Sequence, residues 1–264
     1  KYAPHVQKHI STQASICNYE TANAWYDLGA SRVILAREVP LEDIREIRQK
    51  TPPELEIEAF VHGAMCVSYS GRCLLSNYMT GRDSSRGACA QPCRYQYYLM
   101  EEKRPGEYFP VFEDNKGTYI MNSRDMCMID HVAELMDAGL NSLKIEGRAK
   151  SAYYAAIVTG AYRHAIDAAA QGIPLDPVWR DEVEKVSHRH YSTGFYYGYP
   201  GQFYEDSRYI RDWQVAAIVQ DCTPDGLATL SLRNKFKAGD QVELVGPGCK
   251  PMAFAAPMMT DEEG

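Results

Sequence analysis

Short apolar runs alternate with helix-like patterns along the first part of the chain. Three apolar runs predict buried strands, at residues 6–11, 32–36 and 55–61. Between them, apolar residues recur three or four positions apart, which predicts helices over residues 19–28 and 41–50. Asn18 is a good N-cap for the first helix, and Gly29 is a good stop signal after it.

The same rhythm returns after a long irregular stretch at residues 63–117. It predicts a strand at 119–121, a helix at 125–137, a strand at 142–145 and a helix at 149–170. Strands that alternate with helices at this spacing are typical of a parallel sheet or a barrel. An eight-stranded barrel needs roughly 200–250 residues. We therefore expect an α/β fold with a partial TIM-like (β/α) barrel, and the alternative is a small open α/β sheet.

The chain begins with Lys1 rather than Met. Because the β/α repeats are too few for a whole barrel, we expect a fragment whose missing half-barrel precedes Lys1.

The pattern changes in the last third of the chain. Residues 175–212 are expected to form a bridge, with a helical piece near 181–190 and a loop rich in Tyr and Gly at 191–204. Short strands are predicted at 215–219, 228–232 and 241–245, with turns at Asp225-Gly226 and at 238–240. The expected domains are a partial barrel (1–174), the bridge, a small C-terminal β-barrel module (213–250) and a poorly ordered tail (251–264).

Composition narrows the class of protein. The chain has 264 residues, of which 45% are hydrophobic and 24% charged, as in ordinary globular domains. No apolar run is long enough for a transmembrane helix, so no membrane association is expected. The formal net charge of −7 disfavours a generally basic surface for nucleic acids.

Four of the eight cysteines fall close together in the irregular stretch. Cys66, Cys73, Cys89 and Cys93 have the spacing C-x6-C-x15-C-x3-C. Clustered cysteines in a long chain indicate metal or catalysis more often than disulfides. Thiolates suit zinc or an iron–sulfur cluster, and the two C-x2-C knuckles of a zinc ribbon are absent. The spacing favours a cluster, while zinc and four inert buried thiols remain alternatives.

The other cysteines stand apart. Cys127 is a spare ligand candidate, although a small core-facing side chain explains it as well. Cys17, Cys222 and Cys249 have no partners in the sequence and are expected to be structural.

The irregular stretch is also locally basic. Between residues 61 and 98 there are four arginines against one aspartate, a net charge of +3. Tyrosines are interleaved with them, at positions 69, 78, 95, 97 and 98. Arginines with aromatic rings suit stacked bases and phosphates. A solvated loop with ordinary tyrosine packing is the alternative.

Further charged residues follow the predicted strands, where barrel enzymes place their chemistry. Arg37 and Glu38 follow the strand at 32–36, and Glu58 and His62 flank the end of the next. Lys144, Glu146 and Arg148 lie at the end of the strand at 142–145. The arginines could clamp a carboxylate bidentately, or any of these groups could form a structural ion pair. No G-x-S-x-G, H-E-x-x-H, G-x-G-x-x-G or P-loop motif is present.

Several motifs resemble those of the U32 peptidase family, once called collagenase-like proteases. One runs from Glu58 through Cys66 to Ser76. Others lie at residues 119–125 and 143–148, and at residues 9–13 together with 35–38. The resemblance covers about residues 5–200, and the β module after Trp213 is similar to the family's C-terminal appendage.

The resemblance implies a TIM-like barrel and a [4Fe–4S] cluster held by four cysteines. By motif match these are Cys66, Cys73, Cys89 and Cys93. Some relatives take the fourth ligand from a position near residues 119–122, where this sequence has no cysteine, and Cys93 is the substitute. The motifs are most similar to those of the family's tRNA hydroxylation members, which convert the wobble uridine of tRNA to 5-hydroxyuridine with prephenate instead of oxygen.

The leading hypothesis is therefore a cytoplasmic enzyme of tRNA modification. Arg37, Arg72 or Arg148 would hold a prephenate-like dicarboxylate, and the insert rich in Arg and Tyr would hold the tRNA. Glu38, His62 and Glu146 are the remaining candidate catalytic groups. A U32-type peptidase is the second hypothesis, and a non-catalytic, metal-stabilised RNA-binding factor is the third.

Overall fold

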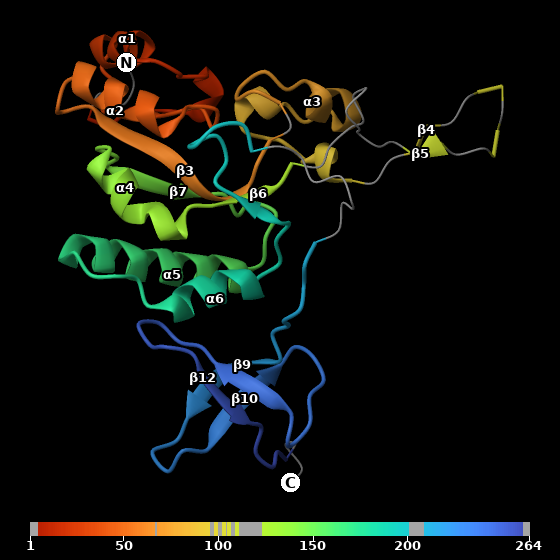
Figure 1. Cartoon of the computed structure of the whole chain (residues 1–264). Coiled ribbons are helices and arrows are strands. Elements are labelled where there is room, and N and C mark those ends of the chain that lie inside the picture. Colours follow the sequence, from red (N-terminus) through yellow and green to blue (C-terminus); the bar gives the residue numbers. More distant parts are fainter. Residues whose placement is uncertain are drawn as a thin grey trace. The chain divides into compact units, whose positions relative to one another are not determined.

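Strand β3 (Glu56–Ala64) is the centre of the main sheet in the computed structural model (Figure 1). It pairs in parallel with β2 (Arg32–Ile34) and β7 (Ser142–Ile145), and β6 (Asp125–Cys127) runs antiparallel beside its last residues. Every residue of β3 after Glu56 is buried. Burial of both faces is typical of a parallel sheet covered on both sides.

The structure describes residues 5–66, 68–95, 98–99, 102–103, 105–106, 109–110, 123–200 and 209–260. They fall into two compact units, each made of two separate stretches of chain. The first unit contains residues 1–148 and 188–210, and the second contains residues 149–187 and 211–264. Each unit is described by itself.

Two short strands complete the main sheet of the first unit. β1 (His9–Ile10) pairs with β2, and β8 (Tyr191–Ser192) pairs with β6, both in parallel. The order is β1-β2-β3-β6-β8, with β7 also on β3. The α/β class with a largely parallel sheet is confirmed, whereas the partial barrel stays a prediction. The strand predicted at 119–121 lies outside the described residues.

The two N-terminal helices form where the sequence predicts them. α1 (Tyr19–Asp27) begins at Asn18, whose side chain accepts a hydrogen bond from the Thr21 N–H. α2 (Leu41–Lys50) buries Leu41, Ile44 and Ile47, the predicted apolar stripe. These helices pack on one another, and Figure 1 shows α2 beside β3.

The helix predicted over residues 125–137 is partly wrong. Its first three residues form β6, residues Ile129–His131 form a 3-10 turn, and only Val132–Asp137 form the helix α4. The side chain of Asp125 is 1% exposed and accepts a hydrogen bond from the Arg189 N–H at 3.2 Å. Pairing with β3 and β8 overrides the local helix signal.

A polar network crosses β2, β3 and β7. Glu58 accepts hydrogen bonds from Arg32 Nη1 at 3.2 Å, Ser142 Oγ at 2.8 Å and Lys144 Nζ at 3.0 Å. Burial opposes ionisation, but the lysine, the serine and the arginine outweigh it, so the pKa of Glu58 lies below its usual value of 4.5. Glu58 and Lys144 therefore join the strands. They form a structural ion pair, which is the alternative to a role in ligand binding or catalysis.

The irregular stretch contains more regular structure than the sequence indicates. α3 (Leu75–Thr80) is followed by 3-10 turns at Ser84–Arg86 and Pro92–Arg94. A small antiparallel pair joins β4 (Tyr98–Leu99) and β5 (Phe109–Pro110).

The second unit begins with two packed helices. α5 (Ala152–Gln171) starts three residues later than predicted because Ser151 caps it, and Gly172 ends it in the left-handed region. α6 (Pro177–Lys185) lies earlier than the predicted 181–190, because Asp176 is its N-cap and Pro177 its first residue. Lys185 pairs with both Glu182 and Glu243 at 2.6 Å, which joins α6 to the β module.

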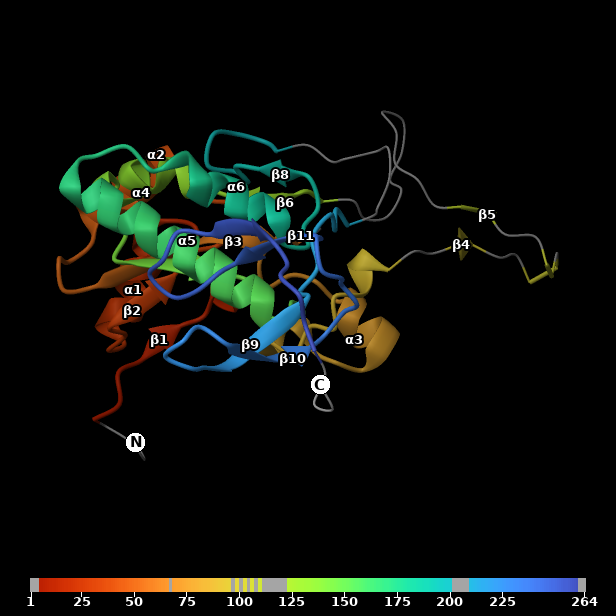
Figure 2. The ribbon, with the colours of Figure 1, turned by 90° about the horizontal axis from the view of Figure 1, so that it is seen from below.

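The C-terminal β module consists of two antiparallel pairs (Figure 2). β9 (Ala217–Cys222) and β10 (Ala228–Leu232) form a hairpin that turns at the predicted Asp225-Gly226. β11 (Gln241–Leu244) pairs with β12 (Met252–Ala255). The expectation of a poorly ordered chain after residue 250 is wrong for β12. In the part of the chain that is described, no helix has both the length and the apolarity to cross a membrane.

Candidate metal centre

A cavity of about 80 Å³ lies beyond the end of β3, and all four insert cysteines line it. Cys66 lies two residues after the strand and Cys73 two residues before α3. Cys89 precedes the turn at Pro92–Arg94, and Cys93 is the middle residue of that turn. All four have intermediate exposure. The predicted ligands are thus gathered around one space.

Close backbone packing fixes the segments that carry Cys66 and Cys73. At Gly63, with φ +105°, an added Cβ would lie 2.2 Å from the Glu146 carbonyl oxygen. At Gly71, with φ +74°, it would lie 2.2 Å from the Gln13 carbonyl oxygen. Only glycine permits these approaches.

Side-chain hydrogen bonds hold the rest of the insert. The Ser70 N–H and hydroxyl both donate to Glu38 Oε1, at 3.0 and 3.3 Å. Ser76, fully buried in α3, accepts the Ala90 N–H at 2.9 Å, and the Ser84 hydroxyl donates to the Cys73 carbonyl. Glu38 therefore has a positioning role, and it is not among the described residues that line the cavity.

The thiols interact electrostatically. Burial raises the pKa of the Cys66 thiol, and the Cys73 and Cys89 thiols raise it further, whereas a backbone hydrogen bond at Ser68 and the Arg37 guanidinium lower it. Among the described residues, no group of three or more Cys, His, Asp or Glu converges tightly enough for a single metal ion. Four thiolates are a donor set that suits zinc as well as an iron–sulfur cluster.

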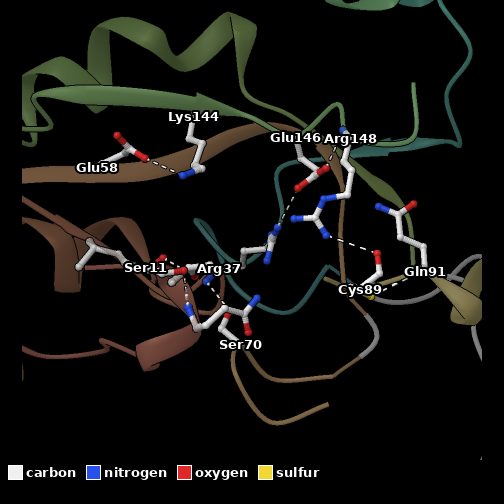
Figure 3. Close-up of polar contacts among 12 residues, drawn as sticks. Ser11, Arg37, Glu58, Ser70, Cys89, Gln91, Lys144, Glu146 and Arg148 are labelled. Carbon is white, nitrogen blue, oxygen red and sulfur yellow. Dashed lines mark hydrogen bonds and ion pairs between the residues drawn. The ribbon is translucent and has the colours of Figure 1, made fainter. Parts of the chain in front are cut away.

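Three charged side chains line the same cavity (Figure 3). Arg37 Nη2 lies 3.6 Å from Glu146 Oε2, and its guanidinium stacks 3.8 Å above the Phe60 ring. Glu146 Oε1 accepts the Arg148 N–H at 2.9 Å, and Arg148 Nη1 donates to the Cys89 carbonyl at 3.4 Å. Two guanidinium groups and one carboxylate thus line the cavity together with the thiols.

The model of peptidase family U32 matches residues 1–206, and that of the peptidase family U32 C-terminal domain matches residues 211–264. The chain belongs to peptidase family U32. It is 39% identical over 94% of its length to "tRNA hydroxylation protein P" of Escherichia coli, and 37% identical over 92% to the protein of that name from Haemophilus influenzae. It is 36% identical over its whole length to "tRNA hydroxylation protein P1" of Bacillus subtilis.

This U32 chain spans only part of those relatives. It covers 64% of the Escherichia coli and Bacillus subtilis proteins and 63% of the Haemophilus influenzae protein. No solved structure matches the chain.

The remaining predicted site residues lie away from the described cavity lining. His62 is 1% exposed, and its Nε2 lies 3.3 Å from the Tyr191 hydroxyl. Arg72 is exposed, and Cys127 is buried in β6. Cys17, Cys222 and Cys249 are exposed, and their structural role stays a prediction.

Two amides that the sequence does not single out also line the cavity, Gln13 and Gln91. Gln91 adopts the left-handed conformation with φ 57° and ψ 42°, and its N–H donates to Cys89 Sγ at 3.3 Å. A residue before proline avoids helical conformations, so this backbone is strained. The position between Cys89 and Cys93 is the only sequence signal that could have indicated it.

Proposed function

We propose that this chain binds a [4Fe–4S] cluster through Cys66, Cys73, Cys89 and Cys93 and takes part in hydroxylating the wobble uridine of tRNA with prephenate as cosubstrate. The observation that carries the proposal is that four thiols, two guanidinium groups and one carboxylate line a single cavity. The family membership and the names of the relatives support the same activity.

The cavity has room for more than one water molecule and offers the donor atoms that a cluster requires. Its volume of about 80 Å³ is several times the roughly 10–15 Å³ that one water molecule requires. Thiolates are the usual ligands of iron–sulfur clusters. When bound, a cluster supplies redox and Lewis-acid chemistry at the cavity wall.

The protein's own groups would bind and orient the cosubstrate. A planar guanidinium matches a carboxylate in bidentate geometry. Arg37 is held by Phe60 and Glu146, so its position is set before a ligand arrives. Arg148 lies on the Cys89 side of the cavity. We assign one carboxylate of a prephenate-like dianion to each arginine and propose no ligand contact for Arg72.

The main sheet would belong to a larger barrel in the complete protein. This part of the proposal rests on the parallel strands β1, β2, β3 and β7 and on the greater length of the relatives.

A peptidase is the weaker alternative for this geometry. None of the described residues that line the cavity is a histidine, and His62 hydrogen-bonds to Tyr191 instead. A thiol nucleophile needs a base within hydrogen-bond reach. The cavity thus favours ligand binding over acyl transfer.

Two measurements test the proposal. The chain is purified without oxygen and analysed for iron, sulfide and zinc together with its visible spectrum. Cys66→Ser, Cys73→Ser, Cys89→Ser and Cys93→Ser should each reduce iron and sulfide, whereas the exposed Cys222→Ser should not. Equal iron content in all five variants would contradict the ligand assignment.

The second measurement is nucleoside mass spectrometry of tRNA from a strain that lacks its own tRNA hydroxylation proteins and expresses this chain. The appearance of 5-hydroxyuridine supports the enzyme. RNA binding without any new nucleoside would favour the non-catalytic RNA-binding factor, and iron-independent gelatin hydrolysis would favour the peptidase.

A further inference from the structure

Aromatic rings are unusually exposed on the Cys-rich insert. Tyr69, Tyr78 and Tyr95 are 70%, 86% and 56% exposed, and the apolar Leu74 next to α3 is 78% exposed. An exposed group of large apolar side chains on one segment commonly marks an interaction site. We call the three tyrosines, together with Arg72 and Arg82, the Arg/Tyr surface.

The segments that carry these rings are held by hydrogen bonds. Tyr78 lies in α3, which packs against the turn at Pro92–Arg94. The Ala90 N–H donates to the buried Ser76 hydroxyl at 2.9 Å, and the Tyr95 hydroxyl donates to the Ala90 carbonyl at 3.2 Å. Tyr78 and Tyr95 are therefore exposed side chains of one packed scaffold.

The charge around these rings is positive, in contrast to the whole chain. Arg72, Arg82 and Arg86 are exposed, and Asp83, 3.5 Å from Arg86, is the single acidic residue between positions 61 and 98. The chain as a whole has a net charge of −7. A segment with a net positive charge in an otherwise acidic chain favours a polyanion as its partner.

Tyr69 connects this surface to the candidate metal centre, because it is both strongly exposed and part of the cavity lining. We propose that the Arg/Tyr surface binds a single-stranded RNA loop, with bases stacked on Tyr78 and Tyr95 and phosphates paired with Arg72 and Arg82. The nucleotide beside Tyr69 would then face the cavity. This inference rests on the proposed function and adds the region that binds the substrate.

An RNA loop fits better than a duplex or a protein. Unpaired bases stack on aromatic side chains, whereas bases inside a duplex present no free faces. A second copy of this acidic chain lacks phosphates for the arginines. Aromatic and basic groups occur here together, which is the combination that single-stranded nucleic acid requires.

The test is fluorescence anisotropy with the purified chain and two labelled RNAs, a stem with a seven-nucleotide loop and a blunt duplex of equal length. Tyr78→Ala should weaken loop binding about tenfold. The matched control is Tyr199→Ala. Tyr199 is also strongly exposed, at 73%, but lies outside the Arg/Tyr surface, so its removal should leave the affinity unchanged. Thermal unfolding of both variants shows whether the fold is retained.

The charge is tested by salt dependence. The double variant Arg72→Gln/Arg82→Gln should reduce the slope of log K against log salt by about 0.7 for each lost phosphate contact. Arg163→Gln, at an exposed arginine on α5, should leave the slope as it is.

Several outcomes would overturn the inference. They are unchanged loop binding by Tyr78→Ala, equal binding of loop and duplex, absence of RNA binding by the unaltered chain, or a dimer that Tyr78→Ala dissociates without any effect on RNA. The proposed function fails separately. If the loop binds through these residues but no hydroxylated nucleoside is formed, RNA binding by the Arg/Tyr surface is supported and the proposed hydroxylation is contradicted.

Discussion

The Glu146 carboxylate lies 3.6 Å from the Arg37 guanidinium, and the two side chains come from the ends of different strands. At this separation the pair attracts without the short contacts of a close bidentate bridge. Both side chains are more than four-fifths buried, and both line the candidate metal centre. An incoming carboxylate would compete with Glu146 for Arg37.

Glu146→Gln should therefore increase the affinity for a dicarboxylate. Glutamine retains an oxygen that accepts the Arg148 N–H and removes the negative charge beside Arg37. Loss of roughly 1 kcal/mol of competing attraction corresponds to about fivefold tighter binding. Isothermal titration with prephenate measures it, and Arg37→Gln, which removes the guanidinium, should bind more weakly. Weaker binding by Glu146→Gln would show that this carboxylate contacts the ligand directly.

Gly71→Ala should destabilise the insert far more than Gly81→Ala. Both glycines have positive φ, +74° and +70°, so a side chain is strained at each by about 1 kcal/mol. At Gly81 the new Cβ meets nothing within 4 Å, whereas at Gly71 it would overlap the Gln13 carbonyl oxygen. Thermal unfolding and iron content of the two variants provide the comparison. Equal losses would mean that the Gln13 segment moves freely away from Gly71.

Gln91→Gly should stabilise the fold by about 1 kcal/mol, because glycine adopts the left-handed conformation without strain. Ser15→Gly is the matched control, since Ser15 is the other described non-glycine residue with positive φ, at 55°. Both variants should unfold at higher temperature. Only Gln91→Gly should weaken dicarboxylate binding, because Gln91 lines the cavity. Equal binding by both variants would assign Gln91 no ligand contact.

Glu58 makes the stability of the fold depend on pH. Its pKa in the folded chain lies below the usual value of 4.5, so the unfolded chain binds the proton more tightly. The stabilisation is fully present above the unfolded pKa and is lost as the pH falls through the folded one. Glu58→Gln should remove this contribution, on the order of 1 kcal/mol after solvent screening. Urea unfolding at pH 7 and pH 3 measures it, and an identical pH dependence in both proteins would refute the assignment.

The sequence predicts those parts of the fold that depend on local pattern. The bounds of α2 follow from Leu41, Ile44 and Ile47, whose spacing shows the buried face directly. β6 could not be predicted in this way, because the local pattern from Asp125 onward predicts a helix and only the distant partners β3 and β8 make a strand favourable. β12 is missed for the same reason, since its partner β11 lies across an intervening loop.

In the candidate site, too, some residues could be predicted from local sequence and others could not. Cys66, Cys73, Cys89 and Cys93 are apparent from their spacing, and Arg37, Glu146 and Arg148 from their places after strands. Gln91 is not apparent from the sequence, because a glutamine before a proline gives no local indication of a left-handed backbone conformation. The buried hydrogen bond of His62 depends on Tyr191, which is distant in the sequence.

The discontinuity of the first unit has a consequence for its synthesis. The Tyr196 hydroxyl donates to the Phe60 carbonyl at 2.6 Å, and the Leu41 N–H donates to the Tyr196 carbonyl at 3.0 Å. These contacts link β3 and α2 to a segment translated long after them, with α5 and α6 made in between. During translation, the main sheet cannot be completed until β8 has been synthesised. The nascent chain therefore exposes the cysteine-bearing insert before the first unit is fully folded.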